Sequence, residues 1–223
     1  KKRHETRIKM QTAVSPDMST TVVRFVAKIR ERKMEISTAQ AYEAIFPRFP
    51  LDEKGIAIDL NNRDGSGGKS HWKSLAQDIT TQVKQALAPG NDHLRIDHLS
   101  IFAAAPMPLL MYLGNRIGGA TPVDVYQKHR DIDDWKWKKE PKRDVFRYIV
   151  KKNATNNPGT KVALVLSLSG QVQMNEVAKV LRSAPRYEIT IPKPDRDYLQ
   201  HRSQLAKFAY VYRRLLTEIR KKH

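Results

Sequence analysis

An apolar segment that runs directly into a proline-bounded helix start is the feature that most constrains the fold of this chain: HLSIFAAAPMPLLMYLGNRI, His98 to Ile117. Pro106 stops strand pairing because it has no N–H group, and Pro108 fits the first turn of a helix, where no N–H is needed. A strand over residues 98–104 and a helix from residue 107 are therefore predicted, with the two glycines after Ile117 ending the helix. Such a turn leaves backbone N–H groups at the edge of a sheet, where a phosphate or nucleotide binds.

The early turns of this helix are apolar on nearly all sides, which is typical of a helix buried in an α/β layer. The apolar residues in question are Leu109, Leu110, Met111 and Leu113. Upstream, residues 55–60 predict an apolar strand, and a helix is expected from about Ser70. Trp72, Leu75, Ile79, Val83 and Leu87 share one face of that helix at helical spacing. A strand over residues 122–129 follows.

A second round of the same pattern begins near residue 144. Strands are predicted over residues 144–152, 161–170 and 187–192, with a helix over residues 174–182. A long final helix follows, with Asp195 and Asp197 expected near its positive end. Its apolar stripe is predicted to be core: Leu205, Phe208, Ala209, Tyr212, Leu215, Leu216 and Ile219. The fold class is therefore α/β, with two Rossmann-like halves that have mainly parallel sheets and flanking helices.

The N-terminal section, residues 1–54, is expected to be a small adaptor. Residues 21–36 alternate loosely and pass through a charged tip at Arg30 to Lys33, which favours a β-hairpin, and a basic helix is the alternative. Thr38 is expected to cap a short helix through Ile45. The main body is then residues 55–223, with halves of about 55–140 and 141–223.

A formal net charge of +18 and a pI near 10.1 indicate an anionic partner. Three classes qualify: a small nucleotide, a long nucleic acid or an acidic membrane surface. The basic clusters are Lys1 to Lys9, Lys128 to Lys152 and Arg213 to His223. The terminal two are interpreted as solvated tails and helix faces. The middle one includes Trp135, Trp137, Phe146 and Tyr148, which makes stacking on a base plausible.

The residue types argue against catalysis by the chain itself. Cysteine is absent, which excludes disulfides and thiolate zinc sites. The seven histidines are scattered, without metal-ligand spacing, and no G-x-S-x-G elbow is present. Asp131, Asp133 and Asp134 cluster beside Lys and Arg and are interpreted as surface ion pairs. No catalytic residue, metal or cofactor is therefore expected, and no apolar run is long enough to span a membrane.

The loop DGSGGKS, residues 64–70, lies between a predicted strand and helix, which is the context of a phosphate loop. It lacks the first glycine of the Walker A motif, because that position is Arg63. A surface loop is the favoured interpretation, and closure over an anionic ligand, with Lys69 as a contact, is the alternative.

The run IFAAAPMPLLMYLGNRI, followed by VDVYQKHR and WKWK, resembles the SAVED domain of bacterial anti-phage CBASS effectors. That resemblance implies two fused CARF-like subdomains with a cyclic di- or trinucleotide, made by a CD-NTase enzyme, held between them. It also implies a bacterial cytoplasmic setting and ligand-driven self-association. Because the chain opens Lys-Lys-Arg-His and SAVED domains are fused to effectors, an upstream HNH-type nuclease that acts on DNA is expected.

The candidate contacts come from the ends of strands and the residues after them. In the first half they are Lys69, Pro106, Met107, Pro108, Leu109, Gln127, Lys128, Arg130, Trp135 and Trp137, with either tryptophan covering a base. In the second half they are Ser167, Ser169, Gly170 and Gln171, in a turn that allows close backbone approach.

Two other functional classes stay open. A basic module that acts directly on DNA or RNA predicts affinity that falls steeply with salt and little preference for cyclic ligands. An enzyme that cleaves its own nucleotide ligand, as CARF-like relatives do, predicts loss of the ligand on long incubation.

Overall fold

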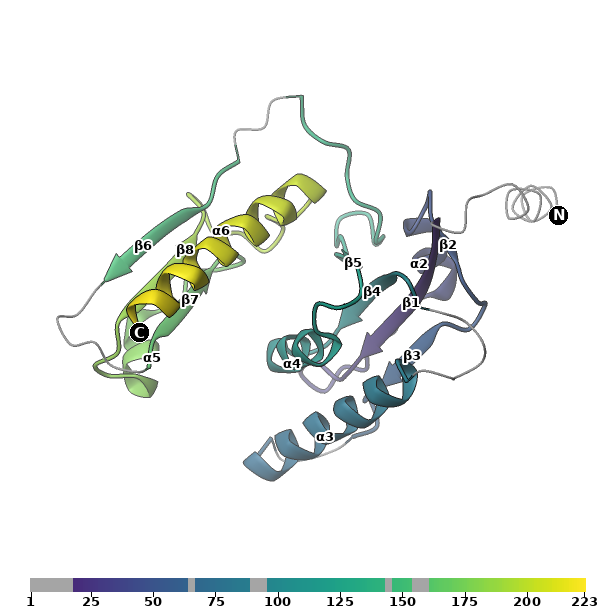
Figure 1. The fold of residues 1–223 in the computed structure, drawn as a ribbon, viewed down its shortest axis with the longest axis horizontal. Helices are drawn as coiled ribbons and strands as arrows, with labels where there is room; N and C mark the ends of the chain where they lie inside the picture. The colour runs from purple at the N-terminus through teal and green to yellow at the C-terminus, as the bar shows by residue number, and fades with distance from the viewer. Residues whose placement is uncertain (1–17, 64–66, 89–95, 143–145, 154–160) are drawn as a thin grey trace. The chain divides into compact units, whose positions relative to one another are not determined.

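The chain divides into two units, residues 1–136 (unit 1) and 137–223 (unit 2), each with its own sheet (Figure 1). This computed structural model describes residues 18–63, 67–88, 96–142, 146–153 and 161–223. The boundary between the units lies between Lys136 and Trp137, a few residues before the expected division at 140/141.

Within its described residues, unit 1 has a five-stranded, fully parallel sheet with three helices. In chain order its elements are β1 (Ser19–Val26), α2 (Thr38–Ala44), β2 (Phe49–Pro50), β3 (Ile56–Asp59), α3 (Lys69–Ala86), β4 (Leu99–Ala104), α4 (Met107–Ile117) and β5 (Val123–Tyr126). β4 lies between β1 and β5, while β2 and β3 both pair with the other edge of β1. This is the Rossmann-like arrangement that the strand and helix pattern predicts.

β1 is the central strand of this sheet, although it lies in the section expected to be an adaptor. Its sequence, STTVVRFV, is rich in β-branched residues and is almost entirely buried, as is typical of a strand covered on both faces. The expected hairpin over residues 21–36 is therefore wrong. Residues 21–26 pair in parallel with β3 and β4, and only a turn at Arg30 and Glu31 remains of the hairpin.

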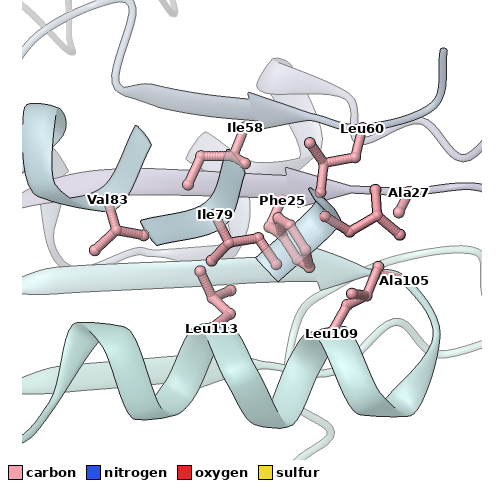
Figure 2. Packing of buried hydrophobic residues seen from close by; sticks show 10 residues of the cluster. Phe25, Ala27, Ile58, Leu60, Ile79, Val83, Ala105, Leu109 and Leu113 are labelled. Carbon is pink, nitrogen blue, oxygen red and sulfur yellow. The ribbon is translucent and has the colours of Figure 1, made fainter. Parts of the chain in front are cut away.

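Alternation along β1 divides the core of unit 1 into two layers. Phe25 and Ala27 face α3 and α4, where they pack with Leu75, Ile79, Val83, Leu109 and Leu113 (Figure 2). Arg24 points to the opposite face, where its guanidinium donates to the Thr38 hydroxyl at the start of α2. This packing confirms Leu75, Ile79 and Val83 as core positions of the predicted stripe, whereas Trp72 on the same stripe is 37% exposed. The prediction that the helix from residue 107 is buried on nearly all sides is wrong, because only Leu109 and Leu113 are buried while Met107 and Met111 are 64% and 66% exposed. The short helix is capped by Ser37, not by Thr38.

Unit 2 is smaller and its sheet is mixed. Its elements are β6 (Ile149–Asn153), β7 (Ala163–Ser167), α5 (Met174–Val180), β8 (Arg186–Thr190) and α6 (Arg202–Lys222). β8 is the middle strand, parallel to β7 and antiparallel to β6. Tyr187, Ile189 and Leu215 centre a core that α6 covers with Phe208, Tyr212 and Ile219, so the predicted apolar stripe of the final helix is core.

α6 begins seven residues after Asp195, later than expected. Asp195 and Asp197 form a local turn, in which the Asp195 carboxylate accepts from the Asp197 N–H at 2.8 Å. The helix starts at Arg202, where His201 and Gln204 form a reciprocal capping box. The capping geometry, rather than the dipole effect of the two aspartates, therefore fixes where α6 starts.

Candidate functional site

A cleft of about 620 Å³ opens at the carboxyl edge of the unit 1 sheet. Its apolar floor consists of Ala27, Leu60 and Pro106, which follow β1, β3 and β4 respectively. The chain passes from β1 to β3 on one side and then crosses back to β4 on the other, so the cleft lies at the topological switch point of the sheet. This is the position where open parallel α/β sheets bind their ligands.

Two helices begin at this edge without a capping side chain. The N-cap of α3 is Gly68 and that of α4 is Pro106, and neither residue type has a side chain that can accept a hydrogen bond. Gly67, His71 and Trp72 from the start of α3 line the cleft together with Pro106 and Leu109 from the start of α4. The positive ends of both helix dipoles therefore lie beside the cleft, an arrangement that favours anions.

The wall after β1 is a two-residue turn with an unusual backbone. Ile29 and Arg32 exchange backbone hydrogen bonds of 3.0 and 3.1 Å, which forces Arg30 and Glu31 to φ values of 50° and 64°. Non-glycine residues with such left-handed conformations are uncommon and cost free energy, and they concentrate at ligand sites. The turn holds Arg30 and Glu31 against the cleft, next to Lys28.

Arg63 and Trp72 provide the side of the cleft formed by the loop after β3 and by α3. The Arg63 guanidinium is held by Asp78 of α3, with 2.9 Å between Nε and Oδ2. The Trp72 indole is 37% exposed, which is high for so large an apolar side chain. The cleft thus combines cations from two segments, an exposed aromatic ring and an apolar floor, which suits a ligand with both phosphates and bases.

Several residues predicted as contacts lie at this edge. Pro106 and Leu109 line the cleft, and Met107 and Pro108 are exposed in the same helical turn. The Leu109 N–H was expected to contact a phosphate, but it already donates to the Pro106 carbonyl at 2.9 Å and is therefore not available. Lys69 is exposed in the first turn of α3.

The residues after β5 follow the same sheet edge but are not among the described residues that line the cleft. The Gln127 amide donates to the Lys128 carbonyl at 3.0 Å. The Lys128 ammonium lies 2.8 Å from the Asp133 carboxylate and over the ring of Trp135. Arg130 is exposed in the loop that the His129 to Asp134 bridge closes. The predicted surface ion pair of the acidic cluster is confirmed for Asp133.

Trp135 is a core residue, which corrects the expectation that it covers a base. Only 1% of it is exposed, and its ring meets Phe102 edge to face at 5.4 Å between centroids. The prediction that Trp135 and Trp137 share one strand face is wrong, because residues 135–137 form no strand and Trp137 belongs to unit 2. Phe146 and Tyr148 also pack in a core, that of unit 2. The aromatic residues in the middle basic cluster are mostly structural, because they flank the sheets.

In unit 2 the predicted contacts follow β7. The Ser167 side chain is buried and accepts from the Val172 N–H at 3.3 Å, so it stabilises the turn itself. Ser169, Gly170 and Gln171 are exposed in that turn, ahead of the short helix α5.

The main lining residues that the sequence did not indicate are Lys28, Arg30, Arg63, His71 and Trp72. The hairpin prediction places Arg30 at a tip, and the stripe prediction places Trp72 in the core. The sequence signal for Trp72 as a lining residue is its position in the first turn after a glycine-containing segment, where a helix meets the sheet edge.

Neither a metal site nor a membrane span is found in the described parts of the chain. No group of three or more His, Asp or Glu side chains there is arranged to hold a metal ion. None of the helices described combines the length and the apolar character needed to cross a bilayer.

Comparison with protein families identifies the family of this chain. The model of the SMODS-associated and fused to various effectors sensor domain, abbreviated SAVED, matches residues 79–223. No curated protein matches the chain. The matched region runs from the middle of α3 through β4, α4 and β5 and then through all of unit 2 to the end of α6, and β1, β2 and β3 precede it. The chain therefore belongs to the SAVED family of sensor domains.

Proposed function

We propose that this sensor domain binds a cyclic oligonucleotide, a di- or trinucleotide ring, with the unit 1 cleft as a principal contact. The observation that carries the proposal is the junction of two uncapped helix starts with Lys28, Arg30 and Arg63 at a switch-point cleft. A volume of about 620 Å³ is within the usual range of small-ligand pockets.

The chemistry of such a ring fits the cleft in three ways. Its phosphodiester anions suit the helix starts and the cationic side chains. One base suits the exposed face of Trp72, where base stacking is worth about 1 to 3 kcal/mol. The sugar and ring edges suit the apolar floor of Ala27, Leu60 and Pro106.

In this proposal the chain binds the ligand, and a fused domain carries out the catalytic reaction. Ligand binding drives self-association, which activates a DNA endonuclease attached to the sensor. The ligand comes from a CD-NTase enzyme in the bacterial cytoplasm. Support for recognition over catalysis comes from the sensor family and from a cleft built of charge, helix ends and one aromatic ring.

The first test is a thermal-shift screen of the chain against cyclic di- and trinucleotides, with linear dinucleotides and linear DNA beside them. A ring at 100 times its dissociation constant stabilises the folded state by about 2.7 kcal/mol. We expect one ring to raise the melting temperature well above linear dinucleotides. A shift with linear DNA and with no ring would favour direct nucleic-acid binding alone, and loss of the intact ring on long incubation would favour a nucleotide-cleaving enzyme.

The second test is calorimetry of the ring on variants of α3. Trp72→Ala removes the stacking surface and should weaken binding about 5- to 150-fold, which corresponds to about 1 to 3 kcal/mol. Trp72→Phe should recover most of the loss. Lys73→Ala, an exposed neighbour that does not line the cleft, is the control and should bind normally. Wild-type affinity in Trp72→Ala would remove this residue from the site.

A further inference from the structure

A second concave surface lies within unit 2, along α6 beside β6. This groove has a volume of about 580 Å³ and an apolar floor that includes Val150, Val211 and Leu215. Its rim carries Lys152 from β6 and Tyr210, Arg213, Arg214, Glu218 and Lys221 from α6. The residues from Tyr210 to Lys221 follow one side of the helix at helical spacing, so the rim is continuous.

The groove is strongly cationic although it contains a carboxylate. Glu218 accepts from the ammonium groups of Lys152 at 2.6 Å and Lys222 at 3.0 Å. These two contacts hold the pKa of the Glu218 carboxyl below its usual value, so its charge is present and already compensated at neutral pH. Arg213 and Lys221 are exposed, and in the part of the chain that the structure describes neither pairs with a carboxylate.

An aromatic ring is exposed beside these cations. Tyr210 is 61% exposed, and the Arg214 guanidinium lies over its ring at 5.6 Å from the centroid. The same guanidinium donates to the Tyr210 hydroxyl at 3.2 Å. An exposed aromatic ring paired with an arginine is the surface on which unpaired bases stack.

The packing of α6 argues against an acidic membrane as the partner. A basic helix that binds a bilayer inserts its apolar face between the lipids. The apolar face of α6, with Phe208, Leu215 and Ile219, is already committed to the unit 2 core. Only the polar side of α6 and the groove remain for a partner, which favours a hydrated polyanion.

We infer that this groove binds a single-stranded nucleic acid through its phosphodiester backbone. The helix from Tyr210 to Lys221 is about 16 Å long at 1.5 Å per residue, long enough to follow the phosphates of a short stretch of one strand. Arg213 and Lys221 contact phosphates, and Tyr210 with Arg214 stacks a base. The site lies wholly in unit 2 and does not depend on the unit 1 cleft.

The test is fluorescence anisotropy of a labelled 20-nucleotide single strand over a range of salt concentrations. The variant Arg213→Gln with Lys221→Gln removes two exposed cations without touching the core. Its affinity at low salt should fall about tenfold, and the slope of log K against log salt should become shallower by about 1.4, since each phosphate contact on a single strand contributes about 0.7.

The matched control is Arg182→Gln with Lys193→Gln, which removes the same charge from exposed positions of unit 2 outside the groove. It should bind within about twofold of the wild type. An equal loss in both double variants would show that the net charge acts diffusely and would overturn the site, as would the absence of binding at low salt.

Tyr210→Leu tests the choice of a single strand. It should weaken single-strand binding several-fold and leave duplex binding nearly unchanged, because a duplex offers no unstacked base. Equal affinity for the duplex, or a preference for anionic lipid vesicles, would overturn this choice. Both groove variants should keep the thermal shift with the cyclic ring, so failure here is distinct from failure of the proposed function.

Discussion

Arg30 and Glu31 are the residues at which backbone strain and the cleft coincide. Both have left-handed backbone conformations, and both line the unit 1 cleft. Asparagine or glycine would adopt this turn at lower cost. Retaining Arg30 here positions a guanidinium at the mouth of the cleft, at the expense of stability.

Replacing Glu31 by asparagine tests this interpretation. Because asparagine tolerates φ near +60°, Glu31→Asn should keep or raise the free energy of unfolding, by up to about 1 kcal/mol, as measured by denaturant titration. It also removes the carboxylate that lines the cleft, so calorimetric affinity for the cyclic ring should rise several-fold. Glu35→Asn, an exposed site with the same charge change, should alter neither quantity. Weaker ring binding by Glu31→Asn would contradict a cationic, phosphate-binding cleft.

Among the elements, β1 is the strand on which the unit 1 cleft depends. It pairs with β3 through Val23 to Val26 and with β4 through Thr21 to Val26, so it aligns all three carboxyl ends that floor the cleft. Asn61 ties the following segment to β3, accepting from the Met34 N–H at 3.0 Å and donating to the Met34 carbonyl at 2.8 Å. The cleft therefore depends on contacts between segments about 30 residues apart.

Gly55, just before β3, gives a test of this pairing. Its φ is 60°, and a Cβ atom there would collide with the backbone carbonyl oxygen of Val22. Gly55→Ala should therefore lower the free energy of unfolding by about 2 to 3 kcal/mol, measured by chemical denaturation. Gly114→Ala on α4 is the control, since a Cβ meets no atom within 4 Å and should stabilise the helix by about 0.5 to 1 kcal/mol. A neutral Gly55→Ala would mean that β3 shifts without cost.

For the whole molecule, each unit encloses its own core. Phe25 and Ile79 are fully buried in unit 1, and Ile189 is fully buried in unit 2. Separate cores are the usual basis of separate cooperative units in native-state hydrogen exchange. The proposed ring site and the inferred strand site also belong to different units, unit 1 and unit 2 respectively.

The variant Ile189→Ala tests whether the two units are separate cooperative units. Removing a fully buried side chain from the middle strand of unit 2 should cost about 2 to 5 kcal/mol. Hydrogen exchange followed by mass spectrometry should show faster exchange over residues 137–223 and unchanged protection of β1 and β4. Val180→Ala, at an 81% exposed position, should leave exchange unaltered throughout. Faster exchange in both units would instead indicate one cooperative fold.

The sequence by itself determined the fold class, most elements and the family, because prolines, glycines and apolar periodicity act locally. The strand before Pro106, the helix from Met107 and the core stripes of α3 and α6 all follow from such local signals. The prediction that ligand-binding residues lie where β4 meets α4 also rests on these local signals.

Only the tertiary structure decided which strand is central and which aromatic residue faces the cleft. Strand order depends on pairing between distant segments. The local pattern of residues 21–36 therefore predicts a hairpin, whereas β1 in fact pairs with β3 and β4. Trp72 and Trp135 each have lysines close by in the sequence, and their exposures of 37% and 1% follow from the neighbours that the fold supplies. Local patterns specify what a segment becomes, whereas the surface that it presents depends on what packs against it.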